Sequence, residues 1–502
     1  MMSVDRRAFR EWPLWLAALF AIVWAAIRAS VQSITMDEAD TYFWFVAPSN
    51  VWRFFPNNHV LNSLLMWLST RAFGISALAL RAPALLGAVL YIVACLFLCR
   101  IVTDRFSIQF PLFICLTYNP LIFDYMVAAR GYGLADAFLL LAIAVPVWHS
   151  VRNRLSLCQS CALASLALGL AFTASFSFAF VLLAAFLAIT GWAVRRRNGE
   201  SIARIVACCA LPGLFVVLLI CGYPLAHWTR DDLTWGAHSL REMRQSLVQS
   251  SLYRFDPRFH DTHWYRAVSY LRPLLPPVLA VLCLCQVIAI ALDSSWHRDP
   301  RARWLAKFAS ALAGIVTLSV LLHWMAFRFA NLLLPVGRTG IFFVPLITLL
   351  AGTIAAAPAR SLVSQWLRRG IAAVMLCAAC YFLLCLRLSY FKEYQWDADA
   401  KEVYSVLANY NRTYGVTDFG IFDLCAPALN YYRLLSNSRT FPELKSAPPN
   451  PTGGKPIYVM SQVNQRNFID QERLVVVYRG RYSDTVIAVK PGGPISAVPV
   501  GH

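Results

Sequence analysis

The sequence predicts a polytopic α-helical membrane protein with about eleven spans, followed by a small α/β domain outside the membrane. Of its 502 residues, 59% are hydrophobic and 14% are charged, which is far more apolar than a soluble globular protein. Apolar runs of roughly 20 residues, the length that crosses a bilayer, recur as far as residue 390. The predicted domains are therefore 1–390, which is transmembrane, and 391–502, which is an extracytoplasmic α/β domain.

Each span is placed on an apolar run that ends at charged or turn-forming residues. The runs are 12–31, 78–99, 108–126, 131–150, 157–173, 176–194, 205–225, 273–293, 304–324, 339–357 and 370–390. The stretch 157–194 is too long for one helix, and Thr173-Ala174-Ser175 offers a turn, so it is divided into two spans. The first run is too long for a cleaved signal peptide and is expected to stay as an anchor.

Arginines give the orientation, because loops that stay in the cytoplasm are enriched in Lys and Arg. Alternate connections carry such arginines, in the segments 6–10, 100–105, 152–154, 195–197, 298–303 and 368–369. The remaining connections are assigned to the extracytoplasmic face: the first loop at about 32–77, the turn at Arg130, the loop 226–272, the segment 327–338 and the C-terminal domain. These flanking arginines explain the net charge of +19, so no nucleic-acid partner is predicted. A multi-pass protein of the cell inner membrane follows.

The region after residue 390 predicts one amphipathic helix at 401–411 and strands at 420–422, 457–459, 474–478 and 485–489. All 14 cysteines except Cys425 lie in apolar runs, where small buried packing residues are expected. Cys158 and Cys161 form a C-x-x-C pair, but the sequence nearby holds no second pair, so packing is favoured over a metal or redox site.

An acidic cluster, Asp37, Glu38 and Asp40, follows the first span directly. Carboxylates at a bilayer surface are costly to desolvate, so they are either solvated or held for chemistry, and chemistry is favoured. Asp37 falls in the first turn of a helix, where the dipole keeps a carboxylate ionised and usable as a base. Thr35 and Glu38 fit a capping box, so Glu38 is either a cap or a second catalytic acid. Asp40 lies near the same face, and its alternative is a solvated helix charge.

His59 follows Pro56, Asn57 and Asn58 in a helix-start context. A histidine there is either structural or, together with a carboxylate of the same loop, able to orient a hydroxyl group or hold a divalent metal. The spacing matches no metal motif. No metal ligand is therefore assigned, and the need for a divalent metal stays unknown.

Two arginines, Arg130 and Arg338, oppose the positive-inside trend at the outer ends of spans and suit a phosphate. Gly131 and Gly133 would leave the backbone beside Arg130 open to close approach. The alternative for Arg130 is an interfacial anchor that snorkels to water. Asp136 lies just inside the fourth span, where an acid normally has a partner, and Arg130 is the nearest candidate.

Four segments together resemble one known family: TMDEADTYFWF, NNHVLNSLLMWLSTRAFGISALALRAPALLGAVL, AARGYGLADAFLLLA and GRTGIFFVPL. They are similar to the GT-C superfamily of integral membrane glycosyltransferases, in particular to the branch of protein O-mannosyltransferases and lipid A aminoarabinose transferases. The resemblance covers roughly residues 12–390. It implies a polyprenyl-phosphate-linked sugar donor and transfer on the extracytoplasmic face with inversion at the anomeric carbon.

By this resemblance Asp37 is the base with Glu38 beside it, His59 matches a position that is often His, and Arg130 with Tyr132 matches an R-x-Y context. His59, Asp40 and Tyr132 would position donor or acceptor. The C-terminal segment has no tandem carbohydrate-recognition repeats, and no W-W-D motif is present. A lipid or glycan of the envelope is therefore favoured over a protein as acceptor.

The candidate residues also fit a glycosyl transfer in one step on chemical grounds alone. One displacement at a sugar needs a base on the acceptor hydroxyl, a clamp for the leaving phosphate and exclusion of water. Asp37 would supply the base, and Arg130 with Arg338 the clamp. The alternative is a transporter or flippase of lipid-linked sugars, although the charges gather at the outer ends of spans and no internal repeat is visible. A non-catalytic assembly protein would leave the acidic cluster without a purpose.

Overall fold

The computed structural model describes residues 2–152, 154–228, 235–253, 263–293, 297–358, 361–422, 424–438, 440–447 and 454–491. Within these ranges nine helices are long and apolar enough to cross a membrane. They are built on α1 (Met2–Val31), α4 (Ala77–Val102), α7 (Tyr132–Arg152), α8 (Leu157–Ala174), α9 (Ala179–Arg195), α10 (Ile202–Ala226), α13 (Leu275–Leu292), α14 (Pro300–Ala330) and α16 (Leu362–Leu384). Two shorter apolar helices, α5 (Phe106–Thr117) and α15 (Phe343–Ala356), match the other two predicted runs.

Short breaks divide two of the long apolar stretches into separate helices. The division of 157–194 is confirmed, because α8 ends at Ala174 and a single 3₁₀ turn (Phe176–Phe178) precedes α9. The third run, in contrast, is not one helix. α5 stops at Thr117, and Asn119 caps the short α6 (Pro120–Tyr125) by accepting a hydrogen bond from Leu121 N–H. Proline at the first helical position lacks an N–H and keeps the residue before it out of the helical region, so the helix restarts there.

Helices α8 and α10 pack backbone to backbone. A Cβ added at Gly169 would lie 2.5 Å from the carbonyl oxygen of Gly213, which is the close approach that small residues permit between membrane helices. Cys161 and Cys209 share an apolar cluster at the other end of this interface, so α10 supplies the second cysteine pair that the sequence did not place nearby. All 14 cysteines are free, but the expectation that those in apolar runs are buried is wrong for Cys285, Cys377 and Cys380, which are exposed on the surface of the helices.

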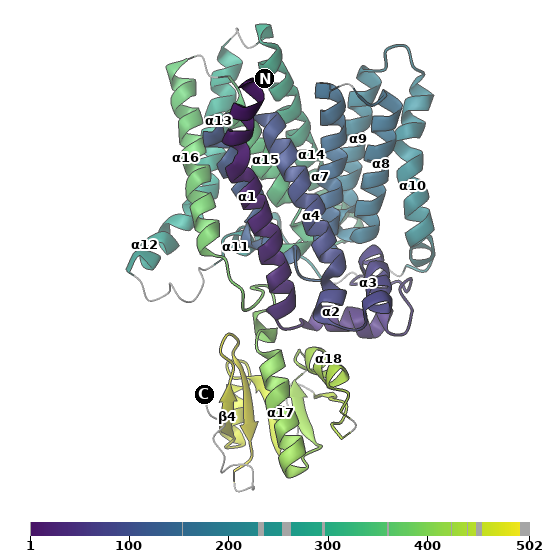
Figure 1. Ribbon diagram of the computed structural model, residues 1–502, viewed down its shortest axis with the longest axis vertical. Coiled ribbons are helices and arrows are strands. Elements are labelled where there is room, and N and C mark those ends of the chain that lie inside the picture. The colour runs from purple at the N-terminus through teal and green to yellow at the C-terminus, as the bar shows by residue number, and fades with distance from the viewer. Residues whose placement is uncertain are drawn as a thin grey trace.

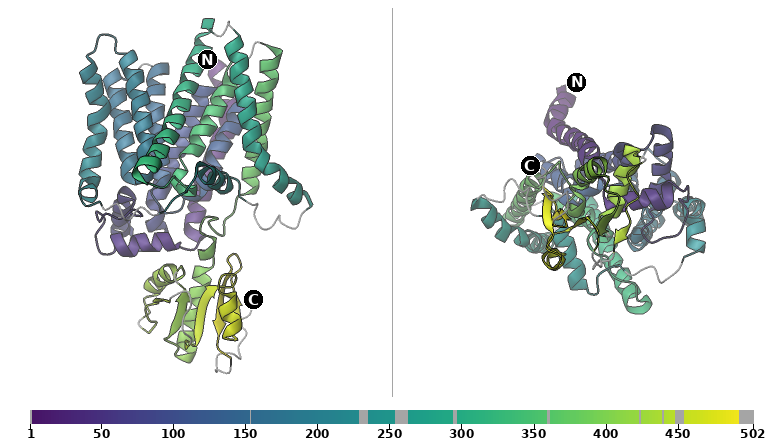
Figure 2. Two further views of the ribbon diagram at one scale, coloured as in Figure 1. Left: turned by 180° about the vertical axis from the view of Figure 1, so that it is seen from behind. Right: turned by 90° about the horizontal axis from the view of Figure 1, so that it is seen from below.

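One end of the bundle carries the short helices α2 (Met36–Thr41) and α3 (Val60–Phe73), and the C-terminal domain lies beyond this end, whereas α1 starts at the opposite end (Figure 1). The domain is docked on α2. The Ile34 amide donates to Tyr432 Oη at 2.9 Å, and the Met36 amide donates to Asp397 Oδ2 at 2.7 Å. The left view of Figure 2 shows the C-terminal domain below the bundle, connected to it by the segment that leads out of α16.

The C-terminal domain contains a five-stranded sheet with the order β2-β1-β3-β5-β4. The strands are β1 (Phe419–Phe422), β2 (Ser446–Ala447), β3 (Ile457–Ser461), β4 (Val475–Arg479) and β5 (Thr485–Val489), and the helices are α17 (Ala400–Tyr414), α18 (Ala426–Ser436) and α19 (Arg466–Gln471). β2, β1 and β3 are parallel, whereas β5 pairs antiparallel with β3 and β4. The predicted helix and four predicted strands are present. Three further elements, α18, α19 and β2, were not predicted from the sequence. The N-cap residue of α18, Cys425, makes no side-chain cap, so this helix starts without a capping signal in the sequence.

Candidate active site

The structure brings Asp37, Arg130 and Arg338 together at the end of the bundle that faces the C-terminal domain. Asp37 lies in the first turn of α2 and is 3% exposed. Its Oδ2 lies 3.2 Å from Arg338 Nη2 and 3.7 Å from Arg130 Nε. The same oxygen accepts a hydrogen bond of 2.8 Å from the Tyr394 hydroxyl, on the segment between α16 and α17. Elements far apart in the sequence thus converge on one carboxylate.

This environment fixes the protonation state of Asp37. Burial alone would raise the pKa of the carboxyl group, but attraction to Arg130 and Arg338 and the hydrogen bond from Tyr394 outweigh it and lower the pKa to about 2. Asp37 is therefore ionised at neutral pH. Held between two guanidinium groups, it is also a weaker base than an ordinary aspartate.

Arg130 is buried, with 1% of its surface exposed, so it does not reach water as an interfacial anchor would. Its Nη1 donates to Thr41 Oγ1 at 2.9 Å and to the Asp37 carbonyl oxygen at 3.3 Å, and its Nη2 donates to Asn57 Oδ1. The predicted pair of Arg130 with Asp136 is wrong. Asp136 is buried in α7, and its carboxylate has no hydrogen-bond partner among the described residues. Arg130 precedes α7 and turns toward α2 instead.

The two glycines beside Arg130 have a different role from the predicted one. A Cβ at Gly131 would lie 1.8 Å from the Ala174 carbonyl oxygen, and one at Gly133 would lie 2.3 Å from the Tyr125 carbonyl oxygen. The space that the glycines leave is therefore filled by protein backbone rather than open to a ligand. They allow the Arg130 turn to pack tightly against the ends of α8 and α6.

Glu38 faces away from this cluster. It completes the predicted capping box with Thr35, and its two oxygens lie 2.9 and 2.8 Å from Nε and Nη2 of Arg81 in α4. Oε1 also accepts the Ala129 amide at 2.8 Å. Burial would raise the pKa of Glu38, but Arg81 and these hydrogen bonds lower it below its ordinary value. Both side chains are completely buried, so Glu38 joins α2, α4 and the Arg130 turn.

Sequence reasoning missed two residues of this arrangement, Arg81 and Tyr394. Arg81 is a charged residue inside the outer part of a span, which was a usable signal of a buried partner. It also donates to the carbonyl oxygens of Ala29, Gln32 and Ser33 and so fixes the end of α1. Nothing in the sequence around Tyr394 distinguishes it from the other aromatic residues there.

Asp40 lies one turn after Asp37. Burial and repulsion from Asp37 raise its pKa from 3.8 to about 6, although Arg130 opposes this shift. Between pH 3.8 and about 6, Asp40 keeps its proton in the folded protein but has released it in the unfolded chain. The free energy of unfolding therefore falls as the pH rises through this window.

Asp40→Asn is therefore expected to raise the apparent Tm near neutral pH by a few degrees. Asparagine is never ionised, so the variant no longer holds a partly buried negative charge beside Asp37. The gain should shrink toward the acid end of the window, where Asp40 is already protonated. Thermal unfolding of the protein in nanodiscs at several pH values would measure this. A gain that is independent of pH would contradict the shifted titration of Asp40.

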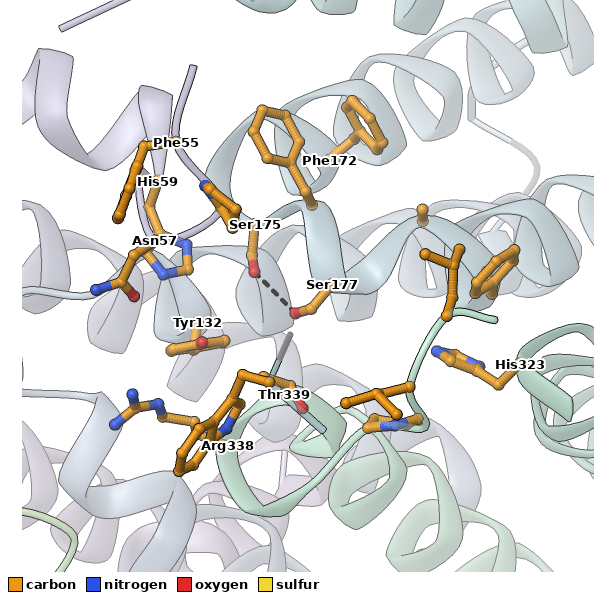
Figure 3. Close-up of a pocket in the computed structure, with 18 of the residues that line it drawn as sticks. Phe55, Asn57, His59, Tyr132, Phe172, Ser175, Ser177, His323, Arg338 and Thr339 are labelled. Atoms are coloured by element: carbon orange, nitrogen blue, oxygen red, sulfur yellow. Dashed lines mark hydrogen bonds between the residues drawn. The ribbon is translucent and has the colours of Figure 1, made fainter. Parts of the chain in front are cut away.

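A cavity of about 550 Å³ adjoins the cluster. Figure 3 shows Asn57, His59, Tyr132 and Arg338 on one side of it and His323 on the other. Three hydroxyl residues, Ser175, Ser177 and Thr339, also line it. The rest of the lining is apolar and comes from Phe54, Phe55, Pro56, Phe172, Phe176, Ala179, Phe180, Leu225, Trp228, Trp235, Leu332, Leu333, Leu334 and Pro335. The cavity is thus mainly apolar, and its one cationic side chain among the described residues, Arg338, lies on the same side as Asn57, His59 and Tyr132.

His59 lines this cavity with a neutral imidazole ring. Burial and the charge of Arg130 lower the pKa of His59 well below its ordinary value, so the imidazole is neutral. Its Nδ1 lies 3.0 Å from the Ala174 carbonyl oxygen, which requires the proton to be on Nδ1. Nε2 then carries a lone pair, and it has no partner among the described residues. The Tyr132 ring packs against the imidazole with centroids 4.7 Å apart.

No metal centre is evident in the described part of the chain. None of its groups of His, Cys, Asp and Glu side chains has the three members that could hold a metal ion. Asp37 is engaged by arginines rather than by other acids.

Comparisons with known proteins find similarity only among solved structures, because no family model and no curated protein matches the chain. ArnT from Cupriavidus metallidurans in the apo state is 11% identical, with 96% of this chain and 98% of ArnT covered and a TM-score of 0.48. The structure of the same protein bound to undecaprenyl phosphate is also 11% identical, with 95% of this chain and 97% of ArnT covered and a TM-score of 0.47. The Archaeoglobus fulgidus oligosaccharyltransferase in the apo form is 14% identical, with 82% of this chain and 63% of the oligosaccharyltransferase covered and a TM-score of 0.38.

Identities and TM-scores this low carry no functional information, so function has to follow from the site's own geometry. The predicted fold class rests on the chain's own spans and sheet. By these the chain is a polytopic helical membrane protein with a small C-terminal α/β domain.

Proposed function

We propose that the protein is an inverting glycosyltransferase that moves a sugar from a polyprenyl-phosphate-linked donor to a lipid or glycan of the cell envelope. One observation carries the proposal: a buried, ionised Asp37 lies between Arg130 and Arg338, and Arg338 also lines an apolar cavity of about 550 Å³. A base, a cationic clamp and an apolar channel are the three parts that such a transfer requires.

The cavity suits an amphiphilic donor. An isoprenoid chain would lie along the aromatic and aliphatic part of the lining, while its phosphate would meet Arg338, which lines the cavity, and the sugar would meet His59 and Tyr132. Guanidinium groups bind phosphate oxygens through paired N–H donors, and their charge stabilises the leaving group. The neutral His59, with its free Nε2, would accept a hydrogen bond from a sugar hydroxyl.

The chemical step is a single displacement. Asp37 accepts the proton of an acceptor hydroxyl, the oxygen forms a bond to the anomeric carbon, and the bond from that carbon to the phosphate oxygen breaks with its electron pair. Polyprenyl phosphate leaves with the added negative charge facing Arg130 and Arg338. Attack from the face opposite the phosphate inverts the anomeric carbon.

Donor binding would also activate the base. In the free protein both guanidinium groups hold the pKa of Asp37 at about 2. A phosphate that engages Arg338 and Arg130 places negative charge beside Asp37 and draws the arginines away from it, and both effects raise the pKa of Asp37. The carboxylate would thus become an effective base only when the donor is in place.

The alternation of arginine-rich connections supports the extracytoplasmic side for this site and for the C-terminal domain. Purified protein in nanodiscs, given undecaprenyl-phosphate-linked sugars and extracted envelope lipids, tests the proposal. Release of undecaprenyl phosphate that depends on the acceptor is expected, with the sugar appearing on the acceptor. Movement of the lipid-linked sugar between leaflets without any cleavage would instead favour the transporter or flippase.

Arg130→Lys is expected to weaken the binding of undecaprenyl phosphate by about tenfold, which corresponds to about 1.4 kcal/mol. Lysine keeps the charge but loses the planar fork, and one ammonium group cannot contact Asp37, Thr41 and Asn57 as Arg130 does. Titration of the lipid into protein in nanodiscs would measure the loss. Arg328→Lys is the matched control, since Arg328 is exposed at the end of α14. Equal affinities in both variants would remove Arg130 from the phosphate site.

A further inference from the structure

A second cavity, of about 650 Å³, lies in the C-terminal domain and shares no lining residue with the cavity of about 550 Å³. It opens where parallel strands end: Phe422 and Cys425 come from the end of β1 and the residues after it, and Ser461 and Asn464 from the end of β3 and its following turn. β1 lies between β2 and β3 in the sheet. The connection after β1 leads to β2 on one side of it, and the next connection leads to β3 on the other side, so the strand order reverses at β1. Ligands of open α/β sheets bind in the crevice at such a reversal, outside the carboxyl ends of the strands.

The lining of this groove combines apolar side chains with polar ones, and its charged groups nearly balance. It contains the amide side chains of Asn464 and Gln465, the hydroxyl group of Ser483, one acid, Asp484, and one amine, Lys392. The acid already accepts a hydrogen bond from Ser461, and the amine donates to Gln395 at 2.7 Å. A cluster of cations that would mark a phosphate site is not present among these described residues. The chemistry suits an uncharged ligand with many hydroxyl groups.

Trp396 adds an aromatic surface to the groove. Its ring is partly exposed, whereas its indole Nε1 is buried and has no hydrogen-bond partner among the described residues. The apolar C–H face of a sugar would pack on the exposed part of the ring. Aromatic and amide side chains placed together in this way are the groups that a saccharide can use.

The groove also adjoins the candidate active site. The Trp396 ring contacts the Tyr394 ring at a centroid distance of 5.7 Å, and the Tyr394 hydroxyl donates to Asp37 Oδ2 at 2.8 Å. On the same segment, Asp397 accepts the amide of Met36, the first residue of α2. Two aromatic residues in contact, Trp396 and Tyr394, therefore connect the groove to the proposed base.

We infer that this groove binds a saccharide, and that it holds the sugar part of the acceptor beside the Asp37 site. The second half of the inference rests on the proposed transferase function, whereas the first half does not. The aromatic face would orient the sugar ring, the amides and hydroxyl groups would select its hydroxyl pattern, and Tyr394 would separate the bound part from the reacting hydroxyl.

The binding test needs neither donor nor turnover. Saturation-transfer NMR on the full chain in nanodiscs would use a panel of neutral hexoses, pentoses and N-acetylhexosamines as probes, with inorganic phosphate as a competitor. Asn464→Ala is expected to weaken the best sugar by about tenfold, and Trp396→Phe by about threefold to tenfold, while both bind undecaprenyl phosphate normally. Asn409→Ala is the matched control, because Asn409 is exposed on α17.

Each outcome bears on the groove separately from the function. Loss of sugar binding in both groove variants but not in Asn409→Ala supports the groove, even if no transfer is ever detected. If transfer is detected, the same variants should raise the KM for the acceptor and leave kcat nearly unchanged. Sugar binding that is unchanged in the groove variants, absence of saturable binding by any sugar, or displacement of the sugar by phosphate would overturn the saccharide assignment.

Discussion

Asp37→Asn is expected to lower glycosyl transfer by about 10²- to 10⁴-fold, the range typical for loss of a general base. Asparagine keeps the size and hydrogen-bonding capacity of the side chain but cannot accept the proton of the acceptor hydroxyl. The same change removes the anion that holds Arg338 at 3.2 Å and Arg130 at 3.7 Å, so both guanidinium groups become available to a phosphate. Undecaprenyl phosphate should therefore bind at least as tightly as it binds the wild type.

This pair of results separates a base from a residue that only supports the structure. Turnover and lipid binding are measured on the same nanodisc preparation, and Asp418→Asn, an exposed acid paired with Lys455 in the C-terminal domain, is the control. A structural role for Asp37 would lower both quantities together. Transfer at the wild-type rate in Asp37→Asn would exclude it as the base and return the transporter to consideration.

The features that could be predicted from the sequence depend on neighbours in the chain. Span positions follow from composition, and the capping box of Thr35 and Glu38 follows from a spacing of three residues. The position of Asp37 in the first turn of α2 follows from that cap. Arg130 and Arg338 could be singled out only because each opposes a trend of charge along the chain, and the structure places both beside Asp37.

What could not be predicted depends on contacts between distant segments. Tyr394 reaches Asp37 across 357 positions of sequence, and no local pattern marks it. Gly131 was interpreted as open space, but the end of α8 fills that space, because a glycine permits any close neighbour and does not specify which one. Asp136 has no hydrogen-bond partner in the described ranges for a related reason, since the arginine nearest in sequence is engaged by an acid from another helix.

Arg81→Met is expected to lower the free energy of unfolding by roughly 3–5 kcal/mol, the range for leaving one member of a buried ion pair without its partner. Glu38 and Arg81 are both completely buried, and methionine would leave the carboxylate without two of its hydrogen bonds. The end of α1 would also lose the donors that Arg81 supplies to three carbonyl oxygens. The apparent Tm in nanodiscs and the yield of folded protein should both fall well below those of Arg71→Met, an exposed arginine in α3.

The double variant Glu38→Gln, Arg81→Met identifies the cause. Glutamine can still accept the Thr35 amide and cap α2, but it carries no charge that needs a partner. If the unpaired carboxylate is the main defect, the double variant will be more stable than Arg81→Met alone, and the coupling between the two positions will exceed the few tenths of a kcal/mol seen for independent sites. Additive losses would mean that Arg81 stabilises the end of α1 mainly through the carbonyl groups, and that the ion pair adds little to the position of Asp37.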